Sequence, residues 1–427
     1  MTDHFEKVKG YKELKKELEY VLDILINTEK YKKLGVSIPK GILLHGKPGV
    51  GKTLMANSFM NASKRNTFTC RKNRPNGSFV EHIKQVFDEA KKNVPAIILL
   101  DDMDKFANED EYHRNAEEYV TIQSCIDDLG DSEVFVFATV NDTRNLPNSL
   151  LRAGRFDQTI YVENPKGKDA EEIIEYYMSP KKYVADIDTA FIAKLLDGRS
   201  CAELEVVINE AGIRAGYNNK EAIEMDDIVD ACIRIFFRAP ESIDCCNREI
   251  EKTAYHEAGH TIIAEILEPG SVNLVSVRPH EGKIGGITCY HQDENYFRNK
   301  YLMEYRVLSL LGGKAATEIT YGDVDVGANS DLHRAFDITS RFVDDYCSTG
   351  FDKWESRKSS NDLLARKELN IYFEMEKYYS IAKKLLIKNR EFLTMVAKAL
   401  VENHTIIASE IQAIKAKCTI NTVGIVI

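Results

Sequence analysis

The chain has 427 residues, which is longer than one typical domain and predicts two or three folded units. Hydrophobic residues make up 44% and charged residues 29%, a globular composition that excludes a mainly disordered chain. The 57 basic and 67 acidic side chains give a formal net charge of −10, the wrong sign for binding nucleic acid through the overall field. We therefore expect no nucleic-acid partner.

The spacing of the cysteines and the length of the apolar runs indicate in which cellular compartment the protein is found. The nine cysteines follow no zinc-knuckle or disulfide spacing, which favours a reducing environment. The longest aliphatic run, 96–100, is far shorter than the roughly 20 residues that span a bilayer. Residues 1–16 are rich in charge and lack the apolar stretch of a secretory signal. We expect a cytoplasmic protein without a membrane span of its own.

Short apolar runs alternate with helical patterns over about the first 160 residues. The strands that these runs predict are 41–45, 68–70, 96–100, 134–139 and 159–162. Strands this apolar need cover on both faces. We therefore expect an α/β domain with a parallel sheet over residues 1–165.

The rest of the chain shows helical periodicity almost throughout. Apolar residues recur at helical spacing over 168–178, 187–197, 202–216 and 224–236. These segments predict a small all-helical domain over residues 166–240. A third domain, 245–427, is expected to be mainly helical, apart from a patch near 271–291 that is typical of strands. The predicted fold class is α/β plus all-α.

Residues 46–53, Gly-Lys-Pro-Gly-Val-Gly-Lys-Thr, fit the pattern G-x-x-x-x-G-K-T between an apolar strand and a helical segment. Glycines let the backbone curl so that successive N–H groups point at phosphate oxygens, and the following helix adds its positive end. Lys52 is expected to reach the outer phosphates of ATP, and Thr53 to bind Mg²⁺. The predicted nucleotide-binding residues of this loop are Gly46, Pro48, Gly49, Val50, Gly51, Lys52, Thr53 and Leu54.

Carboxylates and an amide follow the next two buried strands. Asp101 and Asp102 end the first, an arrangement that holds Mg²⁺ and polarises water beside a phosphate loop. Asp101 is expected to bind the metal, Asp102 to polarise the water and Asn141, just after the second strand, to orient it. Arg152 and Arg155 come next, and arginines in loops are usually solvated, so their role stays open at this point.

Residues 256–260, His-Glu-Ala-Gly-His, place two imidazoles four positions apart within 250–267, a segment of helical periodicity. His256 and His260 therefore share one helix face and can bind one Zn²⁺. Glu257 then lies beside a water whose pKa zinc lowers to about 7, and it can take the proton of that water. The pattern indicates peptide-bond hydrolysis; the alternative is a chance match, or a packing role, without a metal.

A catalytic zinc needs a third protein ligand and one open position. Glu318 and Asp331 are the two acidic candidates downstream. Asp331 stands at the start of a helical pattern, where a carboxylate commonly stabilises the helix N-terminus. Glu318 could instead form a hydrogen bond to one of the zinc ligands and orient it, without contacting the metal. Spacing alone does not choose between them.

The motifs, in this order, resemble those of the FtsH family of AAA+ ATP-dependent zinc metalloproteases. The resemblance extends over residues 5–351 and is carried by 38–41, 49–53, 150–157, 253–260, 311–316 and 329–332. It implies an ATP-dependent metalloendopeptidase that degrades unfolded or tagged proteins. It also implies Zn²⁺, ATP and Mg²⁺ as cofactors.

The resemblance assigns roles to residues that the pattern alone left open. Asp331 corresponds to the zinc-binding aspartate of the family's Asn-Asp-Leu motif, which implies that Asp331 is the third zinc ligand. Glu318 is then implied to contact a ligand rather than the metal. Arg152 and Arg155 become arginine fingers that reach into the adjacent subunit's nucleotide site, so a ring, typically a homohexamer, is implied. The residues that correspond to the family's adenine-contacting segment and lid motif are 8–10 and Ala202.

Several features depart from the family pattern. The family usually begins with membrane helices and this sequence shows none, so we expect a soluble relative, or one recruited to membranes by a partner. Asp102 stands where the family has Glu, and displacing a polarising group by about 1 Å can cost on the order of a hundredfold in rate. Residues 127–129 replace an Asp-Gly-Phe signal between subunits. The region of the aromatic pore loop is short, with Phe79 and Val80 as its expected remnant.

Two other functions fit these departures. One is an ATP-binding ring scaffold with an ATP-independent zinc peptidase activity. The other is a non-proteolytic AAA+ remodelling module with a structural zinc. Glu257 argues against the second, because a structural zinc site has no need of a base.

Overall fold

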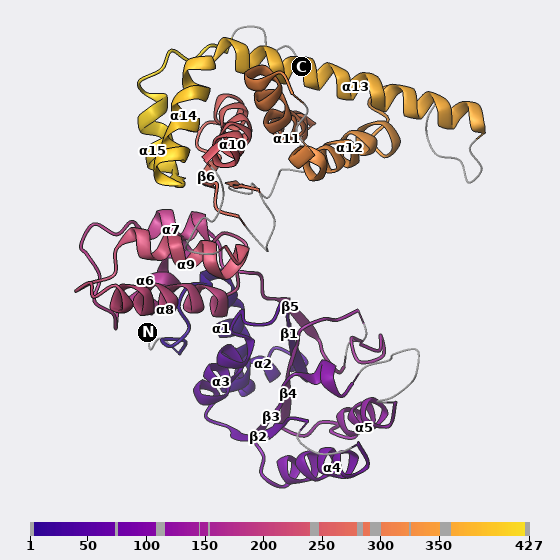
Figure 1. Cartoon of the computed structure of the whole chain (residues 1–427). Helices are drawn as coiled ribbons and strands as arrows, with labels where there is room; N and C mark the ends of the chain where they lie inside the picture. The colour runs from indigo at the N-terminus through magenta and orange to yellow at the C-terminus, as the bar shows by residue number, and fades with distance from the viewer. Residues whose placement is uncertain are drawn as a thin grey trace. The chain divides into compact units, whose positions relative to one another are not determined.

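The computed structural model describes residues 4–72, 76–107, 116–144, 146–152, 154–239, 247–279, 285–290, 300–323, 326–350 and 360–422. The chain divides into two compact units, Met1–Ile228 and Val229–Ile427 (Figure 1). The first carries a parallel sheet and the second is mainly helical, which confirms the predicted fold class. The finer division at residues 165 and 240 stays a prediction.

The sheet of the first unit has five strands, all parallel, in the order β2-β3-β4-β1-β5. Their bounds are β1 Gly41–His45, β2 Asn66–Cys70, β3 Ala96–Leu100, β4 Val134–Val140 and β5 Gln158–Tyr161. All residues of the central strands β3 and β4 are buried. The five apolar runs of the sequence therefore form the five strands, with end shifts of one or two residues.

Helices cover both faces of the sheet (Figure 1). They are α1 Lys12–Ile26, α3 Lys52–Ser63, α4 Asn76–Lys92 and α5 Ala116–Asp127. The short α2 Thr28–Lys32, in which no residue is buried, follows α1, and a 3₁₀ turn lies at Met103–Lys105. Side chains alternate along β4: Phe135 and Phe137 contact Phe59 of α3, with ring centroids 6.0 and 5.1 Å apart. Val136 faces the other way, into the core formed with Ile83 of α4. This alternation explains why strands buried on both faces are uniformly apolar.

Four helices follow the sheet, as the periodicity predicts. They are α6 Gly167–Met178, α7 Thr189–Leu195, α8 Cys201–Tyr217 and α9 Met225–Phe237. Helix α8 begins with a capping box, in which Ser200 and Glu203 each bond the other's backbone N–H. This cap fixes the start of the helix that carries Ala202 of the lid motif.

Besides residues 229–237 of α9, the second unit combines six α-helices with a small antiparallel sheet in the order β7-β6-β8 within the described residues. The helices are α10 Asn247–Leu267, α11 Lys300–Tyr321, α12 Asn329–Asp344, α13 Asn361–Lys388, α14 Arg390–Asn403 and α15 Ala408–Lys415. The strands are β6 Val272–Ser276, β7 Ile287–Tyr290 and β8 Thr405–Ile407. The patch near 271–291 forms β6 and β7, whereas the three-residue β8 is too short for its period to be recognised in the sequence.

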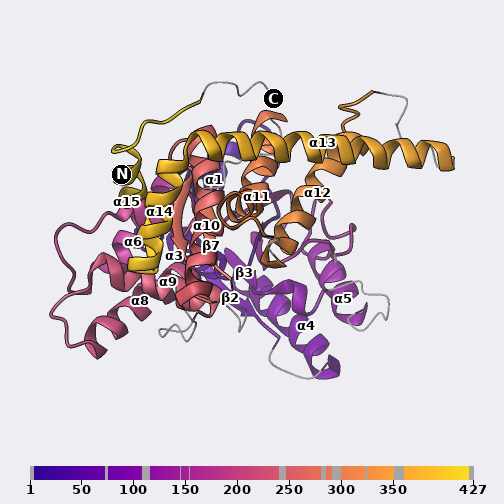
Figure 2. The same ribbon diagram turned by 45° about the horizontal axis from the view of Figure 1, so that its top comes forward.

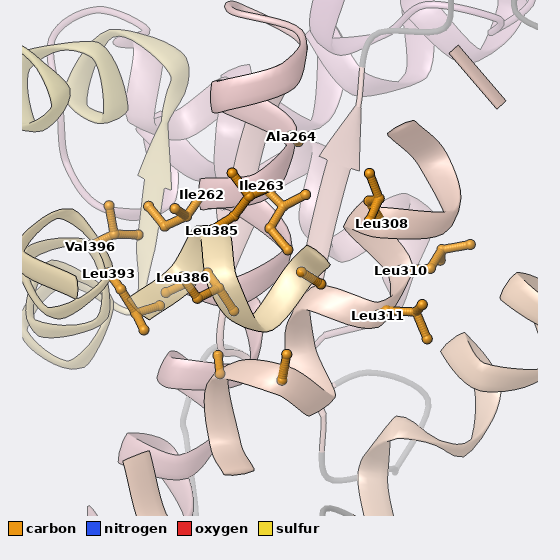
Figure 3. Packing of buried hydrophobic residues seen from close by; sticks show 14 of the residues in the cluster. Ile262, Ile263, Ala264, Leu308, Leu310, Leu311, Leu385, Leu386, Leu393 and Val396 are labelled. Atoms are coloured by element: carbon orange, nitrogen blue, oxygen red, sulfur yellow. The ribbon is translucent and has the colours of Figure 1, made fainter. Parts of the chain in front are cut away.

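The core of this unit lies around α10. Figure 3 shows Ile262 and Ile263 of α10 among leucines of α11, α13 and α14, including Leu311 and Leu386. Helix α13 contacts both α11 and α12 and is the long helix in Figures 1 and 2. Among the described residues, no helix is both long and apolar enough to span a lipid bilayer.

Candidate metal centre and nucleotide site

Three side chains of the second unit converge on one point. His256 and His260 lie one turn apart on α10, both buried, with their Nε2 atoms 2.9 Å apart. Asp331, in the first turn of α12, places Oδ2 3.3 Å from Nε2 of His256 and 3.4 Å from Nε2 of His260. Across the described ranges, these three form the one group of His, Cys, Asp or Glu ligand atoms within 4.8 Å of one another.

The donor set fits a zinc ion. Nδ1–H of His260 donates to the carbonyl of Ser309 at 2.7 Å, which leaves Nε2 with its lone pair for a metal. Burial would raise the pKa of Asp331, but its interactions with the imidazoles of His256 and His260 outweigh it and hold that pKa well below its usual range. Two imidazole nitrogens and one carboxylate oxygen are a zinc donor set that leaves a fourth position open.

Glycines let α11 pass beside these ligands. A Cβ on Gly313 would lie 2.5 Å from Nε2 of His256 and 2.6 Å from Nε2 of His260. A Cβ on Gly259 of α10 would lie 2.3 Å from the carbonyl oxygen of Gly312. Since real Cβ contacts are never this short, the two helices can cross here only as glycine against glycine.

Glu257 lies next to the cluster on the same helix. Its side chain is 5% exposed, and Oε2 accepts a hydrogen bond from Oγ1 of Thr288 at 2.6 Å. Glu257 directly follows the ligand His256 on α10. An anionic acceptor in this position can take a proton from a water held at the metal.

The phosphate loop of the first unit turns at two of its glycines. Gly49 and Gly51 have φ values of 82° and 93°, in the region that favours glycine. The ammonium of Lys52 is buried beneath the loop and donates to the carbonyl of Gly46 at 2.7 Å and to Oδ1 of Asn141 at 2.9 Å. Burial lowers the pKa of Lys52, while nearby aspartates, Asp102 among them, oppose this shift.

The carboxylate next to the loop is positioned by two hydroxyls. Oδ1 of Asp101 accepts from Oγ1 of Thr53 at 3.0 Å and from Oγ1 of Thr139 at 2.8 Å. A threonine hydroxyl beside a carboxylate at the phosphate loop suits Mg²⁺, which prefers oxygen ligands. Oδ2 of Asp102 lies 2.6 Å from Nζ of Lys105, and the backbone of Asp102 has a φ of 52°, in the left-handed region.

Comparison with known proteins supports both sites. Residues 42–164 match the ATPase family associated with various cellular activities (AAA), and residues 245–414 match Peptidase family M41. The ATP-dependent zinc metalloprotease FtsH 2 of Thermoanaerobacter sp. (strain X514) is 30% identical, over 96% of this chain and 82% of the relative. The chain belongs to the FtsH family of ATP-dependent zinc metalloproteases. FtsH of Caldicellulosiruptor bescii is 32% identical, over 95% of this chain and 71% of the relative, and FtsH of Thermus thermophilus is 29% identical, over 96% and 70%.

Membership of the FtsH family confirms the resemblance found in the sequence. The chain is an ATP-dependent metalloendopeptidase with Zn²⁺, ATP and Mg²⁺ as cofactors. Of the two acidic candidates for the third ligand, the structure places Asp331 at the histidines. It ties Glu318 to α13 instead, through Tyr379 and Lys383, with Lys314 of its own helix as a third partner.

Glu318→Gln is expected to lower the thermal midpoint at pH 7. The hydrogen bond from Lys383, followed by those from Tyr379 and Lys314, lowers the pKa of Glu318 from 4.5 to about 2. A depressed folded-state pKa contributes stability above the unfolded value, and this contribution is lost as pH falls from 4.5 towards about 2. Screening of this partly exposed group limits the effect to a few degrees. The difference in thermal midpoint between wild type and variant, measured by circular dichroism, should therefore become smaller as the pH falls from 4.5 towards about 2.

Glu368→Gln on exposed α13 surface makes the same chemical change without these partners and serves as the control. Equal midpoints for wild type and Glu318→Gln at pH 7 would contradict the stabilising role.

The two arginines of the FtsH motif differ in their surroundings. Arg152 is exposed. Arg155 forms a two-point pair with Asp127, Nε to Oδ1 at 2.8 Å and Nη2 to Oδ2 at 2.7 Å. Ala153, between them, lies outside the described residues. Within one chain, Arg152 is thus the arginine that is accessible to a neighbouring subunit, while Arg155 is engaged.

One expectation about the pore loop is wrong. Phe79, taken as the remnant of an exposed aromatic loop, is 0% exposed on α4 and packs edge-on against Phe106, with centroids 5.1 Å apart. Phe79 lies on the face of α4 that packs on the sheet, so its aromatic side chain is part of the core. Residues 73–75, just before α4, lie outside the described residues.

The lid motif contacts the phosphate loop directly. The backbone N–H of Ala202 donates to the carbonyl of Gly49 at 3.0 Å, as expected for a residue near the nucleotide. Sequence reasoning missed Ser309 and Thr288, which hold His260 and Glu257. Each lies 31 or more positions from its partner, so no local pattern reveals the contact.

Proposed function

We propose that this chain degrades unfolded or tagged proteins at a zinc site formed by His256, His260 and Asp331. The observation that carries the proposal is the convergence of these three ligand atoms within 4.8 Å, beside Glu257. Zinc, when bound, supplies a Lewis acid that polarises the peptide carbonyl and activates water. Glu257 takes a proton from that water and delivers it to the leaving amine.

ATP hydrolysis is assigned to the first unit. Lys52 would neutralise the outer phosphates, Thr53 and Asp101 would hold Mg²⁺, and Asp102 and Asn141 would polarise and orient the attacking water. The bonds of Lys52 to Asn141 and of Thr53 to Asp101 support these roles, because they bring all the parts to one edge of the sheet.

A homohexameric ring is proposed for assembly. Arg152 and Arg155 would act on the nucleotide of the adjacent subunit. The exposure of Arg152 supports this role, and the pairing of Arg155 with Asp127 means that Arg155 must first leave that partner. We also retain the domains 1–165, 166–240 and 245–427 as proposals. A cytoplasmic location, with membrane recruitment by a partner where needed, is supported by the free thiols of all cysteines in the described ranges.

The test is degradation of unfolded casein with and without ATP, and with and without a zinc chelator. We expect removal of either ATP or zinc to reduce degradation to background, because translocation and hydrolysis act in series. Degradation that persists without ATP would favour the scaffold with an ATP-independent peptidase. One tightly bound zinc without cleavage of any unfolded chain would favour the remodelling module.

A further inference from the structure

The strand β7 contacts the candidate base through the side chain of Thr288. Oγ1 of Thr288 donates to Oε2 of Glu257 at 2.6 Å, at the short end of the range for a hydroxyl donor. Glu257 is buried, so little water competes for this bond. A β-branched threonine has few rotamers, which helps to hold the hydroxyl in place.

The backbone around Thr288 is fixed to the same core as the zinc helix. Thr288 lies opposite Val275 of β6, and Val275 is buried in the cluster that contains Ala258 of α10. Gly286, just before the strand, allows the close approach, since a Cβ there would lie 2.3 Å from Cγ of Glu257. Any side chain at this position would push the carboxylate aside.

Alternate residues of a strand face the same side. Tyr290, two positions after Thr288, bonds its hydroxyl to Oγ of Ser309 at 3.0 Å. The carbonyl of Ser309 in turn accepts from His260. One face of β7 therefore supports both the carboxylate and a metal ligand.

We propose that Thr288 is a positioning residue that orients the carboxylate of Glu257 for proton transfer. With Oε2 held by Thr288, Oε1 is the oxygen left to accept the proton of the attacking water. The proposal rests on the assignment of Glu257 as the base in the proposed function. A rotated carboxylate would lose this alignment, because proton transfer depends on hydrogen-bond reach.

Thr288→Val keeps the shape of the side chain and removes the donor. We expect kcat for cleavage of a short unfolded peptide to fall by about 10–100-fold with KM nearly unchanged, as for other outer partners of a metal site. Thr288→Ser restores the hydroxyl and should retain kcat within about threefold. Zinc content and the visible spectrum of the Co²⁺-substituted protein should match wild type, since His256, His260 and Asp331 are untouched.

The matched control is Thr339→Val on α12, which removes a buried hydroxyl that donates to the carbonyl of Ala335 at 2.8 Å, away from Glu257. It should leave kcat unchanged. Wild-type kcat in Thr288→Val, equal losses in both variants, or loss of zinc from Thr288→Val would overturn the positioning role. Should Glu257→Gln itself remain active, the assignment of the base fails, an outcome distinct from full activity in Thr288→Val alone.

Discussion

Glu257→Gln is expected to lower kcat for cleavage of unfolded polypeptide by about 10²–10⁴-fold, the usual contribution of a positioned acid–base group. The amide keeps the size of the side chain and can still accept from Thr288, but it cannot take up the proton of the attacking water. The zinc ligands are unchanged, so bound zinc should stay at wild-type stoichiometry. ATP hydrolysis, which depends on residues of the other unit, should continue at the wild-type rate.

The measurement pairs a fluorescent casein assay with phosphate release on the same sample. Glu251→Gln on α10 makes the same change at an exposed position and should leave both rates unaltered. Persistent cleavage by Glu257→Gln would refute the assignment of the base. A parallel loss of zinc would mean that the substitution acts through the metal site rather than through proton transfer.

Local patterns of the sequence predicted the parts of the fold that local physics determines. The strand β4 is apolar throughout because both of its faces are covered, and this run is visible without the structure. His256 and His260 share a face because a helix repeats every 3.6 residues. Such features depend on neighbours along the chain, which is why the predicted elements match the observed ones closely.

Contacts between distant segments could not be predicted in this way. Asp331 and Glu318 are equivalent candidates by spacing; the resemblance to the FtsH family chose Asp331, and the packing of α12 against α11 gives the physical reason. Phe79 resembled a pore aromatic until its burial placed it in the sheet core. Arg155, an expected arginine finger, is paired with Asp127, which lies 28 positions away in the sequence. No local sequence pattern indicates this pair.

Lys52→Ala is expected to lower ATP turnover by at least about a hundredfold, the cost of losing one donor to a reacting oxyanion. Without the ammonium, the outer phosphates lose a buried positive charge, which Gly46 of the loop and Asn141 at the end of β4 hold in place. Degradation of a stably folded substrate should stop, because unfolding requires nucleotide turnover. Cleavage of a short peptide that diffuses to the zinc site should remain near the wild-type rate.

This pattern separates the two roles of the chain within one variant. Lys64→Ala removes an exposed lysine at the opposite end of α3 and serves as the control, with both activities retained. Nucleotide turnover is measured by phosphate release, degradation of the folded substrate by gel, and cleavage of the short peptide by fluorescence. If Lys52→Ala degrades the folded substrate at the wild-type rate, ATP hydrolysis does not drive degradation, and the first unit serves only as a scaffold for assembly.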